Sequence, residues 1–366
     1  MNWDIQLFKL NFDGREVDAV AKVVSGGWLS MGEKILDFES SFEGLLAEKS
    51  YCSAVTNCTA ALHLALLALD VTKGDEVIIP ALTFVADANV VNIVGATPVL
   101  ADCTSTDDWN MSVGSIEAKI TERTKVVIVV HYAGYPCKDI GKITELCKER
   151  GLGLIEDVAH APGATFDGKA CGTWGDIGCF SCYPTKNLGA IGDAGIVVTN
   201  SSSLISKLKV LREYGWKERY ISDVNGINSR LDEIQAAILR VKLKYLDSDN
   251  NKRIEIANIY RTIICKRDSL ILPVKNINMT HVYHQFVIIN DRRDEILSSL
   301  KKINIICGIH YPKPVHQQKA YTSLGYQSVS LVNTNYISDK IFSLPMHPAL
   351  SFEDATIVAN ELCEII

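Results

Sequence analysis

One lysine in this sequence has a setting suited to covalent chemistry. Lys186 lies in an uncharged stretch between two apolar runs, with Pro184 before it and Gly189 after it, and proline and glycine of this kind mark a turn. A lysine among apolar groups loses hydration, which lowers the pKa of its amine and makes the amine nucleophilic. The alternative is an ordinary surface lysine on a loop, which is where most lysines lie.

An acid and a histidine follow another apolar run. Asp157 comes directly after the run Leu152–Glu156, and His160 follows three residues later. Ligands of open α/β sheets bind beyond the carboxyl ends of the strands, so an acid there predicts a negative charge beneath a bound group. The alternative is that Asp157 caps a helix and that His160 is solvated or hydrogen-bonded.

A third group, Thr56–Ala60, stands between a strand-like run and a helical pattern. Hydroxyl groups and free backbone amides at the start of a helix form an anion site. The alternative is that Asn57 or Thr59 serves only as the N-cap of that helix.

Together the three groups meet the needs of one cofactor, pyridoxal phosphate (PLP). PLP requires a lysine for the Schiff base, a carboxylate at the pyridine nitrogen, a phosphate cradle and flat groups against its ring. The sequence has no G-x-G-x-x-G after a strand and no G-x-x-x-x-G-K-[ST]. It also has no G-x-S-x-G and no H-E-x-x-H. We therefore expect PLP and no metal site.

The first two hundred residues predict an α/β fold. Most of the expected strands are continuous apolar or β-branched runs, which is typical of strands buried on both faces. They are Cys52–Val55, Glu76–Ile79, Pro98–Ala101, Val126–Val130, Leu152–Glu156, Gly178–Cys182 and Gly195–Thr199. Helical patterns separate several of them, at Thr59–Leu69, Phe84–Val94 and Lys138–Arg150. This alternation predicts a mostly parallel seven-stranded sheet.

The pattern then changes to helix. Arg230–Leu246 has apolar residues on one stripe and predicts one long helix. The remainder predicts a smaller α+β unit, with strands Gln285–Ile289 and Ile305–Ile309 and helices Arg293–Lys301 and Phe352–Ile365. We expect a large domain over 1–247 and a small domain over 248–366.

The composition excludes several classes of protein. The chain has 366 residues and a net charge of −6, which gives no electrostatic reason to bind nucleic acid. No apolar stretch is long enough to span a membrane, and no signal peptide is apparent. Eleven cysteines without a disulfide framework indicate reduced thiols and a cytoplasmic protein. Cys179 and Cys182 have C-x-x-C spacing, but they lie in a strand-like run, which disfavours a redox pair.

The sequence resembles the DegT/DnrJ/EryC1/StrS family of sugar aminotransferases over nearly its whole length. The resemblance rests on the number and order of its motifs, which begin with Gly27-Trp28 and Phe38-Glu39 and continue with TAALHLAL, PALTFVADANVV, GATPVLAD and VVHYAGYP. It continues through EDVAHAPGA, FSCYPTKNLGAIGDAG, GINSRLDEIQAAIL, HYPKPVH and SLPMHPALS. It implies a fold type I PLP-dependent transferase, with an aspartate aminotransferase-like large domain.

The resemblance also assigns roles to single residues. Lys186 is expected to form the Schiff base and then to move protons, and Asp157 to pair with the pyridine nitrogen. Phe84 and His160 are expected beside the ring, and the phosphate would be held by Thr59, Ala60 and Ser181. Asn228 is expected to reach the phosphate in the neighbouring subunit, so the resemblance implies a homodimer; the alternative is helix capping beside an ion pair of Arg230. Cys58, Cys182 and Ala194 depart from the family's usual Gly, Phe and Gly.

The family's substrates are nucleotide-linked keto-sugars, with L-glutamate as the usual amino donor. The segments YPTKNLGAIGDAG and YGWKERY resemble members that aminate C3 of dTDP-3-keto-6-deoxyhexoses, whereas HYAGYP and EDVAHA also occur in members that act at C4. We favour C3. The candidates for contacts with the sugar or diphosphate are Tyr183, Arg219, Tyr220, His310 and His316, and for each the alternative is a surface or interdomain contact.

Three rival functions remain to be weighed. A PLP dehydratase of this family has His at the lysine position, so Lys186 argues against it. A non-enzymatic PLP-binding regulator generally adds a DNA-binding segment, for which this chain has no spare domain. A nicotinamide oxidoreductase lacks support because the glycine fingerprint is missing.

Overall fold

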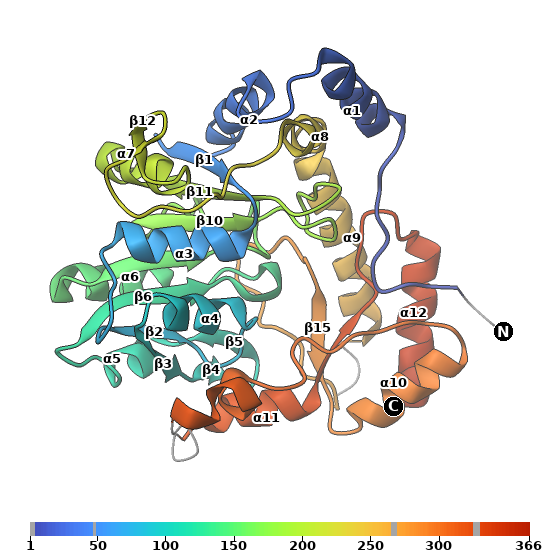
Figure 1. Cartoon of the computed structure of the whole chain (residues 1–366). Coiled ribbons are helices and arrows are strands. Elements are labelled where there is room, and N and C mark those ends of the chain that lie inside the picture. The colour runs from blue at the N-terminus through green and yellow to red at the C-terminus, as the bar shows by residue number, and fades with distance from the viewer. Residues whose placement is uncertain (1–3, 47–48, 265–268, 325–329) are drawn as a thin grey trace.

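The computed structural model describes residues 4–46, 49–264, 269–324 and 330–366. A seven-stranded sheet forms the centre of the large unit, in the order β1-β11-β10-β7-β6-β2-β3 (Figure 1). Its strands are β1 (Tyr51–Val55), β2 (Glu76–Pro80), β3 (Thr97–Ala101), β6 (Thr124–Val130), β7 (Gly153–Asp157), β10 (Ile177–Ser181) and β11 (Gly195–Thr199). β11 runs antiparallel to β1 and β10, and all other neighbouring pairs are parallel. The predicted mostly parallel seven-stranded sheet is confirmed.

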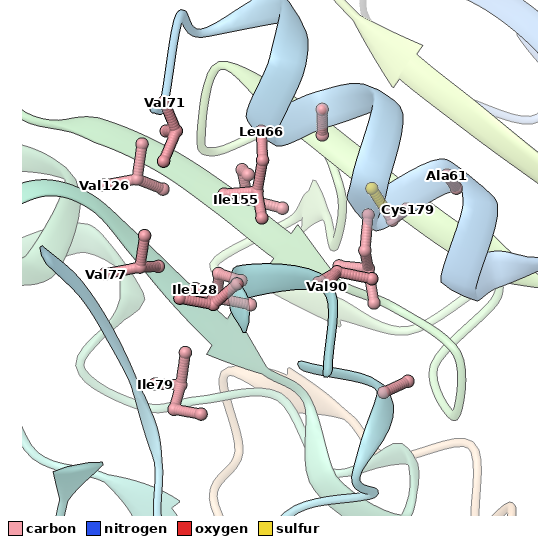
Figure 2. Close-up of a cluster of buried hydrophobic side chains, with 14 of the residues drawn as sticks. Ala61, Leu66, Val71, Val77, Ile79, Val90, Val126, Ile128, Ile155 and Cys179 are labelled. Atoms are coloured by element: carbon pink, nitrogen blue, oxygen red, sulfur yellow. The ribbon is translucent and has the colours of Figure 1, made fainter. Parts of the chain in front are cut away.

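Helices cover both faces of this sheet, which explains the continuous apolar runs. Figure 2 shows one face, where side chains of α3 (Cys58–Ala68) and α4 (Ala86–Ile93) pack with Ile155 of β7. The next residue back along β7, Leu154, belongs to the opposite face with α6 (Ile140–Arg150). Because successive strand residues point to opposite faces, a strand covered on both sides is apolar along most of its length.

A further layer closes the sheet near β1, β10 and β11. It contains α2 (Glu33–Glu43) and α8 (Glu233–Leu243), whose apolar side chains share a core with Phe180 of β10. α1 (Gly14–Gly26) packs on α8 and starts with a capping box, in which Asp13 and Glu16 bond each other's backbone amides.

The helix predicted over Arg230–Leu246 is confirmed over Glu233–Leu243, but it does not continue unbroken to Leu246. The structure has two helices, α8 and α9 (Leu246–Ile264). Between them the amides of Lys244 and Tyr245 bond to carbonyls three residues back, at Val241 and Lys242. These shorter bonds tighten the last turn and end α8. Figure 1 shows α9 leading from the large unit to the small unit beside α12 (Phe352–Ile365).

The small unit is an α+β layer, as predicted. It contains the antiparallel pair β15 (Phe286–Ile289) and β16 (Ile341–Leu344), with α10 (Arg293–Lys302), α11 (Val332–Lys340) and α12. The predicted strand Ile305–Ile309 is wrong. Ile305 pairs with Ile5 and Gly308 pairs with Ser343, each as an isolated bridge. The segment therefore changes partners after three residues, and no continuous ladder forms.

The N-terminal arm packs on the small unit. Ile5 lies in its core with Ile305 and Leu344, and the Leu7 carbonyl accepts a hydrogen bond from the Met346 amide. The N-terminal arm is thus part of the small unit, although the two are far apart in the sequence. A domain boundary near residue 247 falls at the start of α9 and stays a prediction.

Short elements complete the described chain. They are α5 (Val113–Glu117), α7 (Ser202–Leu211), β4 (Cys103–Ser105), β5 (Asp108–Met111), β8 (Thr165–Phe166), β9 (Lys169–Ala170), β12 (Trp216–Glu218), β13 (Ile221–Ser222), β14 (Met279–Thr280), and the 3-10 turns η1 (Tyr132–Gly134), η2 (Val315–Gln317) and η3 (Lys319–Leu324). Within the described ranges, none of the helices is long and apolar enough to cross a membrane. Cys179 and Cys182 are buried free thiols in two different cores.

Candidate active site

A cavity of about 650 Å³ lies beyond the carboxyl ends of the parallel strands. Four strand ends supply its walls: Asn57 and Thr59 follow β1, Phe84 follows β2, Asp157 ends β7 and Ser181 ends β10. Side chains that are far apart in sequence meet there because parallel strands end at one edge of the sheet.

Lys186 enters this cavity from a tight turn after β10. Its amide donates to the Tyr183 carbonyl at 2.8 Å, and a Cβ on Gly189 would lie only 2.4 Å from the Pro184 carbonyl oxygen. The turn therefore requires glycine at position 189. Burial lowers the pKa of the Lys186 amine to about 8, although the charge of Asp157 opposes the shift. An appreciable fraction of the amine is thus neutral near pH 7.

Asp157 brings a carboxyl group to the same cavity. Its Oδ1 accepts a hydrogen bond from the Ala159 amide at 2.8 Å and faces the Cys58 thiol at 3.8 Å. Burial raises the pKa of Asp157, while the amide of Ala159 and the charge of Lys186 lower it. The amine and the carboxyl group thus lie within electrostatic reach of each other, as the sequence predicted.

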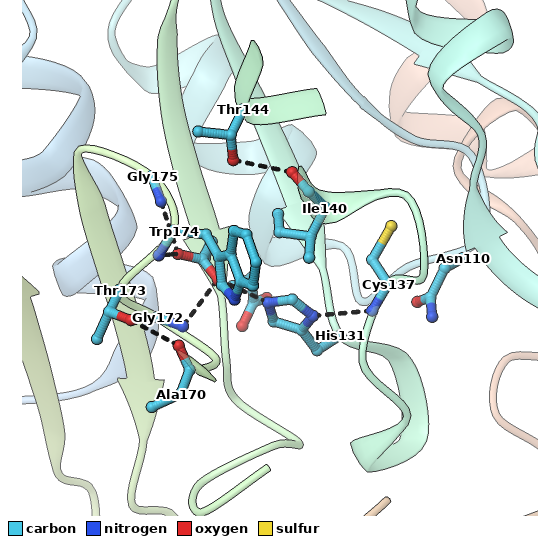
Figure 3. Close-up of polar contacts among 12 residues, drawn as sticks. Asn110, His131, Cys137, Ile140, Thr144, Ala170, Gly172, Thr173, Trp174 and Gly175 are labelled. Atoms are coloured by element: carbon cyan, nitrogen blue, oxygen red, sulfur yellow. Dashed lines mark hydrogen bonds and ion pairs between the residues drawn. The ribbon is translucent and has the colours of Figure 1, made fainter. Parts of the chain in front are cut away.

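The neighbouring acid, Glu156, is built into the framework instead. Figure 3 labels its partners His131, Gly172, Trp174 and Gly175. The two oxygens of Glu156 accept hydrogen bonds from the His131 ring and from three amides, those of Gly172, Trp174 and Gly175, at 2.7–2.9 Å. The other nitrogen of His131 accepts from the Cys137 amide at 3.0 Å, which leaves the proton on the nitrogen that faces Glu156. This network fixes the loops on either side of β7.

Flat side chains line the cavity between these groups. Phe84 is 54% exposed, and its ring centroid lies 5.9 Å from that of Tyr311. The His160 ring stacks on His284 at 4.5 Å, and its Nδ1 accepts a hydrogen bond from the Ala133 amide at 3.2 Å. Burial lowers the pKa of His160 and of His284 well below the usual value, so both rings are neutral at pH 7.

The start of α3 forms the polar end of the cavity. Thr59 and Ser181 bring hydroxyl groups there. The Asn57 side chain accepts a hydrogen bond from the Ala60 amide at 2.8 Å. The simpler interpretation of Asn57, as an N-cap, is therefore confirmed, and the Ala60 amide is engaged by that cap. Thr59 and Ser181 remain available to an anion at this helix start.

Comparison with known proteins identifies the family. The model of the DegT/DnrJ/EryC1/StrS aminotransferase family matches residues 11–363. The chain belongs to this family. The family assignment confirms the predicted resemblance and an aminotransferase rather than an oxidoreductase.

Curated relatives and solved structures are similar to this chain over nearly its whole length. One curated relative, the dTDP-3-amino-3,6-dideoxy-alpha-D-galactopyranose transaminase of Aneurinibacillus thermoaerophilus, is 40% identical over 98% of this chain and 97% of its own length. The structure of DesV from S. venezuelae has a TM-score of 0.92 and 36% identity, covering 96% of this chain and 94% of that one. NtdA from Bacillus subtilis, solved with its bound cofactor PMP, has a TM-score of 0.89 and 28% identity, covering 96% and 81%.

The cavity of this family member fits PLP, the family's cofactor. It offers an amine with a lowered pKa at Lys186 and a buried carboxyl group at Asp157. Hydroxyl groups lie at a helix start, and the Phe84 ring is exposed toward the space between. These are the four features that PLP binding requires.

Several predicted residues lie outside this cavity in the single chain. Arg219 and Tyr220 lie on the β12–β13 hairpin, with the guanidinium 5.0 Å from the ring centroid. Asn228 accepts a hydrogen bond from Arg230, which pairs with Glu213. His316, on η2, bonds to Asn335 at 2.8 Å, and Ala60 is likewise absent from the cavity wall. The roles expected for these five residues stay predictions.

The structure also adds residues that sequence reasoning missed. Tyr311 lines the cavity from the HYPKPVH motif, of which only the two histidines were singled out. His284 and Gln285 come from the small unit and Phe8 from the N-terminal arm. Their positions depend on how the two units pack, and no local pattern in the sequence signals them. Tyr183 and His310, both predicted, do line the cavity.

Proposed function

We propose that the protein transfers an amino group from L-glutamate to C3 of a dTDP-linked 3-keto-6-deoxyhexose, with PLP held at Lys186. The observation that carries the proposal is that Lys186 and Asp157 line one cavity of suitable size beside an exposed aromatic ring. The choice of C3 is supported by the YGWKERY segment and by the relative that is named a dTDP-3-amino sugar transaminase.

PLP, when bound, supplies an aldehyde that accepts the amino group and a ring that takes up electrons. Lys186 would hold the aldehyde carbon through its amine. Once released by the amino donor, the amine is placed to take up and return a proton at the substrate carbon that gains nitrogen. A pKa of about 8 suits both tasks, because the amine can be neutral or protonated near neutral pH.

Other side chains would bind PLP and orient its ring. Asp157 would hold a proton on the ring nitrogen, and Phe84 would cover one face of the ring. Thr59 and Ser181 would bond the phosphate at the start of α3. His160 reaches the cavity as a neutral group, since burial lowers its pKa, so it would orient the ring by hydrogen bonds rather than by charge.

The diphosphate of the sugar nucleotide needs positive charge that this cavity lacks. Among the described residues that line it, Lys186 is the single lysine or arginine, and burial lowers the pKa of His310 to about 4. Arg219 suits a diphosphate through its charged fork. It lies on a hairpin outside the cavity of its own chain, so we propose that it reaches the cavity of a second copy.

The exposed aromatic side chains support this dimer. Tyr220 is 73% exposed on the hairpin, Tyr183 is 50% exposed at the cavity and Trp28 is 67% exposed after α1. Large aromatic surfaces of this kind are typical of protein interfaces. In a two-fold dimer each hairpin would reach the partner in the same way, and Asn228 lies at the base of that hairpin.

Product analysis tests the proposed reaction. The enzyme is incubated with PLP, L-glutamate and either dTDP-3-keto-6-deoxyhexose or dTDP-4-keto-6-deoxyhexose, and the products are identified by mass spectrometry and NMR. We expect an amine at C3 and little turnover of the 4-keto sugar. Preferential amination at C4 would contradict the choice of C3 while leaving the aminotransferase intact.

Mixing two inactive variants tests the shared site. Lys186→Ala and Arg219→Ala chains are purified separately, unfolded, mixed in equal amounts and refolded. If Arg219 acts in the partner's cavity, half of the random dimers contain one intact site, which restores about a quarter of the wild-type activity. Activity no higher than that of the single variants would show that Arg219 serves its own chain's cavity.

A further inference from the structure

A second buried carboxyl group lies behind the cavity, on an element that the mechanism does not use. Asp87 is in the first turn of α4, next to the loop that carries Thr83 and Phe84. Its side chain is completely buried. The Thr83 hydroxyl donates to its Oδ2 at 2.5 Å, whereas no described residue donates to its Oδ1.

Asp87 has a second acid as its neighbour. The carboxyl group of Asp157 lies within hydrogen-bonding range of Asp87. The cationic group that acts on this pair, Lys186, stabilises the Asp157 charge. The other titratable neighbours of Asp87 are neutral buried groups, namely Cys58, Cys179, Tyr311 and Tyr321.

Two carboxylates in contact in a buried site cannot both be ionised. Neither could donate a hydrogen bond to the other, and the Asp87 Oδ1 would remain a buried charged atom without a donor, which is costly. A single proton removes both problems, because a protonated carboxyl group donates to an ionised one. Burial raises the pKa of both groups, in agreement with retention of that proton.

We propose that Asp87 is a protonated positioning residue that shares one proton with Asp157 and holds the Asp157 carboxylate toward the cofactor. The proton belongs on Asp87, because Asp157 has the Ala159 amide and the charge of Lys186 to stabilise its ionised form. The donated hydrogen bond also makes Asp157 a weaker base, so a proton between Asp157 and a pyridine nitrogen stays on the nitrogen. That last consequence depends on the bound cofactor, whereas the shared proton does not.

Infrared spectroscopy of the full-length protein with ¹³C-labelled aspartate detects the proton directly. At pH 7.5 we expect the carbonyl stretch of a protonated carboxyl group, with and without PLP, and we expect it to disappear in Asp87→Asn. Asp102→Asn is the matched control. Asp102 follows β3, and its carboxylate accepts hydrogen bonds from Thr334 and Asn333, so the band should persist in this variant.

Measuring the affinity for PLP distinguishes a positioning role of the Asp87 side chain from a role in filling space. The amide of Asp87→Asn can still donate to Asp157, whereas Asp87→Leu has a similar volume and no donor. We expect Asp87→Asn to bind PLP within a few-fold of the wild type and Asp87→Leu to bind on the order of tenfold more weakly or worse.

A wild-type protein without the band at pH 7.5, or a band that survives in Asp87→Asn, would overturn the proposal. Equal PLP affinity of the Asn and Leu variants would overturn the positioning role. If Asp87→Leu does not fold, the band in the wild type and in Asp87→Asn decides alone. No sugar substrate enters either measurement, so an error in the proposed substrate would leave these results unchanged.

Discussion

Two adjacent acids at the end of β7 meet opposite surroundings. Glu156 accepts four hydrogen bonds, from the His131 ring and three amides, all within 2.9 Å. Asp157 accepts one short hydrogen bond, from Ala159, and a long contact from the Cys58 thiol. Both side chains are almost completely buried. One residue of offset along the strand sends them to different sides of the sheet.

From this difference we infer that Glu156 is a structural carboxylate, and we propose that Asp157 is a functional one. Glu156 has no acceptor capacity left, so its charge serves the loops that it ties together. Asp157 keeps unused acceptor sites in a cavity that also holds an amine, and such incompletely bonded titratable groups are typical of active sites. Removing Glu156 should therefore affect stability, and removing Asp157 or Lys186 should affect chemistry.

Lys186→Ala should have the largest effect. The variant loses both the attachment point of PLP and the proton carrier, and acid–base catalysis alone contributes on the order of 10²–10⁴-fold. We expect kcat/KM for amino transfer to fall by about 10³-fold or more, with the urea unfolding midpoint little changed. A variant with near-normal activity would remove Lys186 from the mechanism.

Asp157→Asn should have the second-largest effect on activity. The amide has nearly the same shape but no charge for the ring nitrogen, and a lost electrostatic partner of this kind costs on the order of 10²–10³-fold in rate. The check is kcat/KM alongside the unfolding midpoint measured for the same preparation. If the loss were matched by an equal loss of folded protein, Asp157 would resemble Glu156 and the contrast would fail.

Glu156→Gln should mainly destabilise the protein. The new amide NH₂ cannot accept the hydrogen bonds that Glu156 accepts, and each buried donor left unsatisfied costs about 1–3 kcal/mol. We expect the free energy of unfolding to fall by about 3 kcal/mol in urea titrations, while the folded fraction still binds PLP. Loss of PLP binding with unchanged stability would contradict the structural role.

The smallest predicted effect is the change with pH in the rate at which PLP attaches to Lys186. Burial lowers the pKa of Lys186 to about 8, so the reactive neutral amine increases as pH rises and reaches a plateau above that value. Attachment of PLP to the cofactor-free protein, followed by absorbance, should accelerate about tenfold between pH 7 and pH 9. Asp157→Asn should move the midpoint down, because the Asp157 charge raises the pKa of Lys186. Glu156→Gln should leave the midpoint unchanged.

Local signals in the sequence were sufficient for the sheet and for the central pair of the site. β2 and β10 are buried along their whole length because both faces are covered, and the apolar runs at their centres, Val77–Ile79 and Gly178–Phe180, are visible without a structure. The turn around Lys186 is marked by Pro184 and Gly189. These features depend on neighbouring residues, so the sequence determines them locally.

Features that depend on tertiary packing could not be predicted in this way. Ile305 pairs with Ile5, which lies far from it in the sequence, and no short sequence pattern indicates this pairing. His284 enters the cavity only because the small unit packs over the sheet. Asp87 looks like an ordinary acid in a first helical turn, and its burial becomes apparent only in the fold.

Chemical trapping of the cofactor tests the central claim most directly. The PLP-loaded protein is reduced with borohydride and digested, and the modified peptide is sequenced by mass spectrometry. The account predicts one modified lysine, Lys186, and no modification in Lys186→Ala. Modification of a different lysine, or none in the wild type, would contradict it.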